Sequence, residues 1–520
     1  MRYHSPVPTY HVENFGCRAT QADGAALERQ FESRGLEPAS ASHADLVILN
    51  TCTVTSSADQ DARAAIRRVQ RHNPLAKIIV TGCYAQRAPQ EIAALPGVTA
   101  VVGNSHKHQL AQIALPLLAD SEKAGVGWRI APSATIDGFD RHAALAAEVD
   151  GQRSHPVFLP LTALTENREL RTENRVFVSD IFAHTELLAA PVFESANLAG
   201  TRENDRTRPN LKVQDGCDNR CSFCVIPSVR GHSRSLPLPQ IIHEINALVA
   251  AGYREVVISG INLGRWGRDL LWGERPRPPK LARTSAPQRF EDLIQTILSE
   301  TTLEKLRISS VEPMDWTNDL IALVASSSRI AKHAHVPLQS GSDAVLRRMH
   351  RKYRPWHYRE KIEKIRAAMP TAAIGADVMA GFPGETDAEF ESTRRLIEDL
   401  PFTYLHVFTY SARPGTPAAA MPNQVPVHIA RERNRILRDL ATAKKLAFML
   451  SFTGSSLAAI TLNVVHNKSG EQFTEALTDN YQKLYLRGHL QPNRWITAHI
   501  EAVEDGAFVG TLKRPTLKSI

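Results

Sequence analysis

The chain has 520 residues, enough for about two to four domains with a sizeable core. Its hydrophobic content of 43% and charged content of 22% are ordinary for a soluble globular protein, and no apolar run approaches the ~20 residues that span a bilayer. The formal net charge of +8 permits binding to a polyanion such as RNA without establishing it. The N-terminus lacks the basic and then apolar layout of a signal peptide, so we expect a cytoplasmic protein whose cysteines stay reduced unless they carry metal.

Three strand–cysteine–helix units make up residues 1–117. The apolar runs ADLVILNT and KIIVTG predict buried parallel strands ending at Cys52 and Cys83, and YHVENFG predicts a less regular strand before Cys17. A helical pattern follows each cysteine, which predicts a doubly wound α/β domain. Because neighbouring parallel strands end at one edge, about 4.8 Å apart, the three cysteines can converge on one site. Three unrelated buried thiols are the alternative.

Two stretches of the chain fit no motif. Residues 118–205 contain TENR twice within a mixed polar composition, and we interpret them as a linker or peripheral insertion. Residues 271–287, rich in Pro and Arg, predict an exposed loop, with contact to RNA phosphate as the less favoured alternative.

Three of the six cysteines lie close together as C-x3-C-x2-C at Cys217, Cys221 and Cys224. Disulfides are disfavoured because the number is odd and the expected compartment is reducing. A structural zinc site usually takes four ligands, and His232 lies outside the usual zinc spacing. Thiolates suit iron–sulfur clusters, and three of them on a four-iron cluster leave one iron open for chemistry.

Residues 206–445 alternate between candidate strands and amphipathic helices. One helix is expected over 239–252 and another over 343–369. The count of units predicts a partial (β/α)6 barrel with its site at the carboxyl ends of the strands. The candidate strands are LKVQDG, EVVISG, KLRISSV, HAHVPLQS, AAIGADVMAGF and YLHVFTYS.

Residues 446–520 change to short β-like runs separated by turn residues, which predict a small all-β barrel. Basic grooves and aromatic platforms on such barrels bind nucleic acid. The candidates for RNA contact are Tyr481, Lys483, Tyr485, Arg487 and Arg494.

The cysteine motif with Phe223 before its last cysteine is similar to the hallmark of radical S-adenosylmethionine (SAM) enzymes. The flanks QDGCDNRCSFCVIPSVRGHSRS resemble the methylthiotransferase branch, and FGCRATQADG, ILNTCTVTSSADQDAR and VTGCYAQR resemble its N-terminal domain. The C-terminal segment resembles the TRAM domain, an OB-like RNA-binding module. The resemblance covers roughly residues 10–115 and 205–516, and Ala19-Thr20 departs from the usual Val and Asn.

The resemblance implies two [4Fe–4S] clusters and two uses of SAM. Cys217, Cys221 and Cys224 would hold the catalytic cluster, whose open iron binds SAM, so that reduction yields a 5′-deoxyadenosyl radical. An auxiliary cluster would carry the sulfur that receives a methyl group, and the methylthio group would then be inserted at an unactivated carbon. The implied ligands of the auxiliary cluster are Cys17, Cys52 and Cys83.

Polar groups at the predicted strand ends are candidates for SAM contacts, by similarity to radical SAM enzymes. They are Gly260, Asn262, Ser309, Glu312, Gln339, Ser340, Gly341 and Asp377. Arg230 adds positive charge near the first cluster, where it would bind substrate phosphate or the SAM carboxylate, or lie on a solvated surface.

The signatures NTCTVT, VTGCYAQ and CDNRCSFCVIPSVRG look most like the MtaB branch, which implies action at C2 of N6-threonylcarbamoyladenosine (position 37) in the tRNA anticodon loop. A MiaB-like action on isopentenyladenosine is one alternative. A RimO-like action on a ribosomal-protein aspartate is another, although the RimO-like CPKN stretch is absent. Outside this family, a non-catalytic iron–sulfur RNA-binding protein and a cluster-based redox sensor with cysteines at a labile site remain. We expect a monomer that does not bind membranes and takes electrons from a donor such as flavodoxin or ferredoxin.

Overall fold

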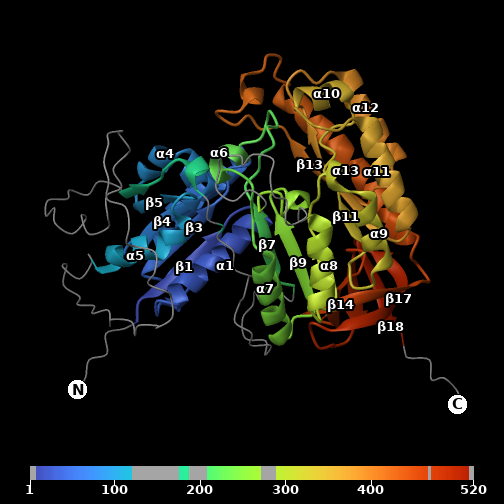
Figure 1. The fold of residues 1–520 in the computed structure, drawn as a ribbon, viewed down its shortest axis with the longest axis horizontal. Coiled ribbons are helices and arrows are strands. Elements are labelled where there is room, and N and C mark those ends of the chain that lie inside the picture. The colour runs from blue at the N-terminus through green and yellow to red at the C-terminus, as the bar shows by residue number, and fades with distance from the viewer. Residues whose placement is uncertain are drawn as a thin grey trace, which may run out of the picture.

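The computed structural model describes residues 7–119, 175–184, 187, 208–270, 289–466 and 470–513. Within them the chain forms an N-terminal parallel sheet with helices, a central arc of strands and helices, and a C-terminal barrel (Figure 1). The unassigned stretches 118–175 and 271–287 lie almost wholly outside the described residues. None of the described helices is both long and apolar enough to cross a membrane.

The N-terminal sheet is fully parallel in the order β2-β1-β3-β4-β5-β6. The chain reverses direction across the sheet between β1 and β3, which makes this edge the topological switch point of a doubly wound fold. The last strand, β6, comes from the range expected to be a linker, so part of that range extends the sheet. The strands are β1 Thr9–Asn14, β2 Glu37–Pro38, β3 Leu46–Thr51, β4 Lys77–Gly82, β5 Val98–Gly103 and β6 Arg175–Phe177.

Helices cover both faces of this sheet because its central strands are apolar on both sides. Leu46 and Ile48 pack with α1 and α5, and Val47 and Leu49 pack with α2 and α4. The doubly wound domain expected from the repeat is therefore confirmed. The helices are α1 Arg18–Glu32, α2 Ser56–His72, α3 Cys83–Arg87, α4 Pro89–Ala93, η1 Lys107–Gln109 and α5 Leu110–Ala119.

The central part carries six parallel strands that neighbour one another in chain order. Paired strands form two sheets, and an isolated bridge between Ser310 and His335 joins β10 to β11. This arc confirms the partial (β/α)6 barrel. A short strand, β8 Arg234–Ser235, pairs antiparallel with β7. The six strands are β7 Asn210–Asp215, β9 Glu255–Gly260, β10 Lys305–Ile308, β11 His333–His335, β12 Ala373–Ala380 and β13 Tyr404–Thr409.

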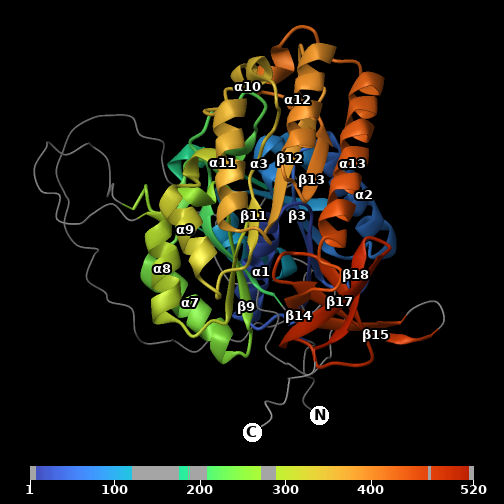
Figure 2. The ribbon, with the colours of Figure 1, turned by 90° about the vertical axis from the view of Figure 1, so that its right-hand side faces the viewer.

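Helices cover the outer face of this arc, as Figure 2 shows for α10 to α13 in front of β11 to β13. The helices of this part, with η4 from the N-terminal side, are η4 Ile181–Ala183, α6 Ile226–Arg230, α7 Leu238–Ala250, η5 Leu263–Arg265, α8 Phe290–Glu300, η6 Pro313–Asp315, α9 Asn318–Ser326, α10 Asp343–Arg348, α11 Pro355–Ala368, α12 Asp387–Asp399, η7 Pro417–Ala420 and α13 Val427–Leu450.

The single helix expected over 343–369 is wrong, because α10 and α11 are separate helices. Pro355 is the first residue of α11, where its missing N–H leaves no hydrogen bond unmade, whereas inside a helix it would break the ladder. The connection between the two helices bends back toward the cysteine loop. It carries Arg351 to that loop.

The C-terminal barrel is closed in the order β14-β15-β16-β18-β17, which confirms the all-β prediction. Its β15–β16 turn docks against the central arc: Asn480 donates to the Thr371 carbonyl over 3.1 Å, and Arg307 donates to the Asp479 carbonyl over 3.2 Å. The strands are β14 Ser456–His466, β15 Gln472–Thr478, β16 Lys483–Arg487, β17 Trp495–Glu504 and β18 Ala507–Leu512.

Candidate active site

A cavity of about 780 Å³ opens where the three parts meet. Its wall includes Cys17 from the N-terminal domain, all three cysteines of the central motif, and Tyr481 from the barrel. This volume is in the usual range of small-molecule sites, about 300–1,000 Å³. Cys17 and the three cysteines of the central motif, far apart in sequence, thus face one space.

The loop with Cys217, Cys221 and Cys224 begins directly after β7. Gly216 precedes it with φ +70°, and a Cβ there would lie 1.9 Å from the carbonyl oxygen of His232. Only glycine fits this close approach of two backbone segments. The Cys217 amide donates to the Gly231 carbonyl over 3.1 Å, which fixes the start of the loop.

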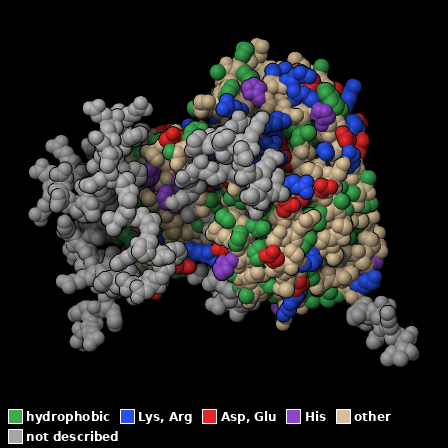
Figure 3. Space-filling view, in the orientation of Figure 1, with side chains coloured by type: hydrophobic (Ala, Val, Ile, Leu, Met, Phe, Trp, Pro, Cys, Tyr) green, Lys and Arg blue, Asp and Glu red, His purple; other side chains and the backbone are tan. Residues whose placement is uncertain are grey.

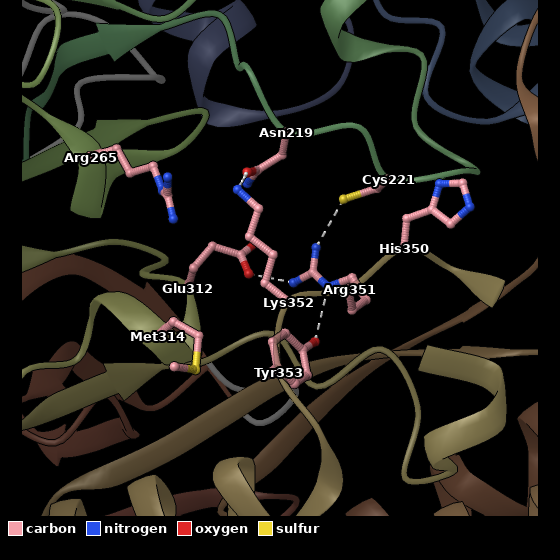
Figure 4. A pocket seen from close by; sticks show the side chains of 9 residues that line it. All are labelled: Asn219, Cys221, Arg265, Glu312, Met314, His350, Arg351, Lys352 and Tyr353. Atoms are coloured by element: carbon pink, nitrogen blue, oxygen red, sulfur yellow. Dashed lines mark hydrogen bonds and ion pairs between the residues drawn. The ribbon is translucent and has the colours of Figure 1, made fainter. Parts of the chain in front are cut away.

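Arg351 joins the cysteine loop to the strand-end carboxylate Glu312 (Figure 4). Its Nη1 donates to the sulfur of Cys221 over 3.3 Å, and its Nη2 pairs with Glu312. Burial alone would lower the pKa of Arg351, but Tyr353, Glu312 and Cys221 outweigh it and hold the pKa well above its usual value. This guanidinium is therefore a fixed positive charge beside a thiolate ligand set.

Burial raises the pKa of the Cys217 thiol, and it raises that of Cys224 to about 12. Redox-sensing cysteines need the opposite setting, a lowered pKa at an accessible site. Buried thiols become good ligands when a metal replaces their protons. The raised pKa values of Cys217 and Cys224 do not fit a sensor that reacts through a free thiolate.

The N-terminal cysteines follow three strands of one sheet, Cys17 after β1, Cys52 after β3 and Cys83 after β4. Gly16, with φ +99°, brings the chain so close to Cys52 that a Cβ at Gly16 would lie 2.8 Å from its sulfur. Burial, then Cys83 and Cys17, raise the pKa of Cys52 to about 12. The three thiols lie near enough to affect one another, as the predicted convergence requires.

Both cysteine sets fit three-thiolate cluster sites by donor chemistry, since soft sulfur ligands converge without a fourth protein ligand. Among the described residues, no three His, Cys, Asp or Glu side chains stand close enough to hold a single metal ion. Cysteines around a four-iron cluster stand farther apart than ligands of one ion, because each binds a different iron.

A buried network of charges joins the N-terminal domain to the central arc beneath the N-terminal cysteines. Asp23 is 1% exposed and pairs with Lys107 and Arg230 at 3.0 and 3.1 Å, and also with Lys212. Arg230 makes two bonds of 3.0 Å to Asp215. Both alternatives predicted for Arg230, binding of phosphate or the SAM carboxylate and a place on a solvated surface, are wrong, because its guanidinium is buried in these ion pairs.

Six of the eight residues predicted to contact SAM line the cavity. Asn262 donates to the sulfur of Cys217 over 3.6 Å, and Glu312 pairs with Arg351. The six residues lie toward the carboxyl-terminal ends of several strands, as a barrel site requires. The six are Gly260, Asn262, Ser309, Glu312, Gln339 and Asp377.

Ser340 and Gly341 do not line this cavity. Both are buried against α12, where the Ser340 hydroxyl lies 3.1 Å from the Thr393 hydroxyl and the Gly341 amide donates to it over 3.0 Å. A Cβ at Gly341 would lie 2.7 Å from the Cα of Thr393. Their positions favour packing over SAM contact.

The sequence prediction missed a group of aromatic and basic residues on the far wall of the cavity. The sequence contains no sign of this group, because its members are single residues far apart in the chain. The fold brings them together from the start of α1 and from strands β11 and β13. The group is Arg18, His333, His335, Tyr404 and His406.

Comparison with known proteins places both motif regions in families. The model described as uncharacterized protein family UPF0004 matches residues 9–103, and the radical SAM superfamily model matches residues 211–397. The threonylcarbamoyladenosine tRNA methylthiotransferases MtaB of Bacillus subtilis and Aquifex aeolicus are each 31% identical to this chain. These alignments cover 92% and 93% of this chain, and 90% and 98% of the relatives.

The tRNA-2-methylthio-N(6)-dimethylallyladenosine synthase of Novosphingobium aromaticivorans is also 31% identical, over 96% of this chain and 95% of its own length. Identity alone therefore does not separate the two named activities. The radical SAM match implies that the chain uses SAM with a [4Fe–4S] cluster. With such similarity over nearly its whole length, the chain belongs to the radical SAM methylthiotransferase family.

Proposed function

We propose that this enzyme methylthiolates C2 of N6-threonylcarbamoyladenosine beside the anticodon of tRNA. The relatives that carry that name support the reaction class and the RNA substrate. The observation that carries the proposal is one cavity lined by Cys17 of the N-terminal set and by all three cysteines of the central motif, because a reaction with two uses of SAM needs its target carbon within reach of both sets.

The proposed roles of the residues follow from their places on the wall. Cys217, Cys221 and Cys224 hold the catalytic [4Fe–4S] cluster, and Cys17, Cys52 and Cys83 hold the auxiliary one. When bound, the clusters and SAM supply hydrogen abstraction, sulfur and the methyl group. The chain would orient these groups: Asn262 and Arg351 contact cysteine sulfurs, and Arg351 holds Glu312, whose carboxylate could accept hydrogen bonds from the ribose hydroxyls of SAM.

A basic rim beside the catalytic cysteines favours an RNA substrate. Arg220, Arg347 and Lys352 are exposed, and Lys352 donates to Asn219 of the cysteine loop over 2.9 Å. Figure 3 shows Lys and Arg side chains gathered over the end of the arc that carries α10. Such charges bind the phosphates on either side of an unstacked base without reading sequence.

The competing function is methylthiolation of the isopentenyl base, which the relative from N. aromaticivorans keeps open. An apolar substituent prefers an apolar pocket. This cavity instead presents Arg18, three histidines and two tyrosines near the barrel. The guanidinium of Arg18, which fits a carboxylate, favours the threonylcarbamoyl base.

Nucleoside mass spectrometry tests the proposal in a host that lacks its own methylthiotransferases. The intact chain should produce 2-methylthio-N6-threonylcarbamoyladenosine in tRNA, and Cys221→Ala should produce none. The isopentenyl derivative in its place would leave the reaction class intact and show the substrate assignment to be wrong. Absence of both derivatives, with both clusters loaded, would turn the search to a ribosomal-protein target.

A further inference from the structure

Arg18 is a cation on the cavity wall without an acidic partner among the described residues. Its Nη2 donates to the neutral hydroxyl of Tyr481 over 3.1 Å. The other arginine on this wall, Arg351, is paired with Glu312. A half-buried guanidinium that faces an open space without a counter-charge favours an anion there.

Tyr481 of the C-terminal barrel holds Arg18 in place. It lies in the β15–β16 turn with φ +65°, a conformation that non-glycine residues rarely adopt and that is enriched at functional sites. Its ring centroid is 4.6 Å from that of His333, and the Arg307 guanidinium lies 5.3 Å from it. The barrel therefore positions a guanidinium that belongs to the N-terminal domain.

Next to Arg18 lies a wall of aromatic rings. The His335 and Tyr404 rings stack with centroids 6.0 Å apart and planes 22° apart, and His406 packs edge-on at 5.3 Å from Tyr404. Rings of this kind stack on unpaired bases in RNA-binding sites. The wall and the guanidinium together present a base-stacking face beside an anion site.

Arg18 supplies a fixed positive charge on this wall, whereas the His333 and His406 imidazoles stay neutral. Burial, Arg307, His335 and Arg18 hold the pKa of His333 well below its usual value, and burial and then His335 lower that of His406. The carboxylate on this wall, Asp377, lies 3.4 Å from Nε2 of His335 and makes no ion pair with Arg18.

We propose that Arg18 and Tyr481 form a carboxylate subsite for the threonyl group of the modified adenosine. The purine would stack on the His335–Tyr404–His406 wall while the guanidinium binds the carboxylate. This inference rests on the proposed function and makes Arg18 the residue that selects the substrate. The isopentenyl group has no polar atom, so it would leave the guanidinium desolvated and unpaired. An RNA phosphate is the other anion that the guanidinium fits.

The test measures dissociation constants of the anaerobic, cluster-loaded chain for anticodon stem–loop RNAs. The RNAs carry N6-threonylcarbamoyladenosine, its glycylcarbamoyl analogue, which keeps the carboxylate, isopentenyladenosine, or unmodified adenosine. Arg18→Met should weaken binding of the two carboxylate-bearing RNAs about 10- to 100-fold and leave the other two unchanged. Arg18→Lys should recover part of the loss, since it restores charge but not the planar fork.

Two controls separate a binding effect from damage to the protein. Arg34→Met removes an exposed charge near the end of α1 and should leave all four constants unchanged. Tyr481→Phe removes the hydroxyl that holds Arg18 and should act on the same two RNAs, more weakly. Iron and sulfide per chain must match the intact protein, because Arg18 follows Cys17.

Equal weakening of all four RNAs by Arg18→Met would assign Arg18 to a phosphate and overturn the inference. Unchanged binding of the threonylcarbamoyl RNA would overturn it as well. Failure of the proposed function has a different signature, because the intact chain itself would then form no methylthiolated product from the threonylcarbamoyl RNA.

Discussion

Asp23→Asn should weaken the contact between the N-terminal domain and the central arc and so destabilise the protein. Asp23 is the shared anion of Lys107, Lys212 and Arg230, and all four side chains are buried. Together with Asp215 the network holds three cations and two carboxylates, a net charge of +1. The substitution leaves three cations against one carboxylate, a net charge of +2 in the same volume.

Two independent estimates give the expected loss in the free energy of unfolding. Burial would raise the pKa of Asp23, but Lys107, Lys212 and Arg230 outweigh it and lower the pKa from 3.8 to about 2, which corresponds to about 2 kcal/mol of stabilisation. Removing one partner from a buried ion pair costs roughly 3–5 kcal/mol. We therefore expect Asp23→Asn to lower the free energy of unfolding by about 2–5 kcal/mol.

The assay is urea denaturation of the cluster-loaded chain, read from the first transition in tryptophan fluorescence. Asp61→Asn is the matched control, because Asp61 is exposed on α2 and its loss should change stability by about 0.5 kcal/mol or less. Adding Lys107→Met to Asp23→Asn returns the net charge to +1 and should recover part of the loss. If Asp23→Asn is no less stable than Asp61→Asn, the buried network does not hold the two parts together.

Three further predictions concern the cysteine loop and the pH dependence of the network. Arg351→Met should lower the affinity for SAM by about tenfold or more while exposed Arg347→Met does not, measured by calorimetry on the cluster-loaded protein, because only Arg351 contacts both Cys221 and Glu312. Gly216→Ala should lower the iron bound per chain, whereas Gly415→Ala, at a similar positive φ but in open space, should not; equal iron contents would show that the backbone collision at Gly216 is absent. The stability difference between the intact chain and Asp23→Asn should be constant above about pH 5 and shrink as the pH falls toward 2, since a lowered carboxylate pKa stabilises only where the unfolded chain is ionised; a difference that grows on acidification would contradict this.

Local patterns predicted the elements of this fold well. Cys52 and Cys83 follow apolar runs, Cys17 follows a less regular strand pattern, and a helical pattern follows each of the three. The strand ends and their shared edge could therefore be predicted from the sequence. The five β-like runs at the C-terminus likewise form the closed barrel. One pattern misled: residues 343–369 have helical composition throughout, yet Pro355 starts a second helix.

The contacts of the site follow from tertiary packing, which local patterns do not contain. Arg351 and Cys221 are 130 residues apart, and Arg18 and Tyr481 are 463 apart. In the sequence Arg230 is a basic residue beside a predicted cluster. In the structure its guanidinium is buried in ion pairs with Asp215 and with Asp23, which is 207 residues away in the chain. The sequence predicted that Ser340 and Gly341 lie in a ligand-binding loop, but both residues pack against α12.

The most direct test is reaction of the purified, cluster-loaded chain with SAM, a reductant and an anticodon stem–loop carrying N6-threonylcarbamoyladenosine. We predict that the intact chain cleaves SAM and forms the 2-methylthio product, that Cys221→Ala does neither, and that Cys52→Ala cleaves SAM without forming the product. A Cys52→Ala chain that forms the product as fast as the intact chain would contradict the division of roles between the two cysteine sets. An intact chain that leaves this RNA unmodified would contradict the proposed reaction itself.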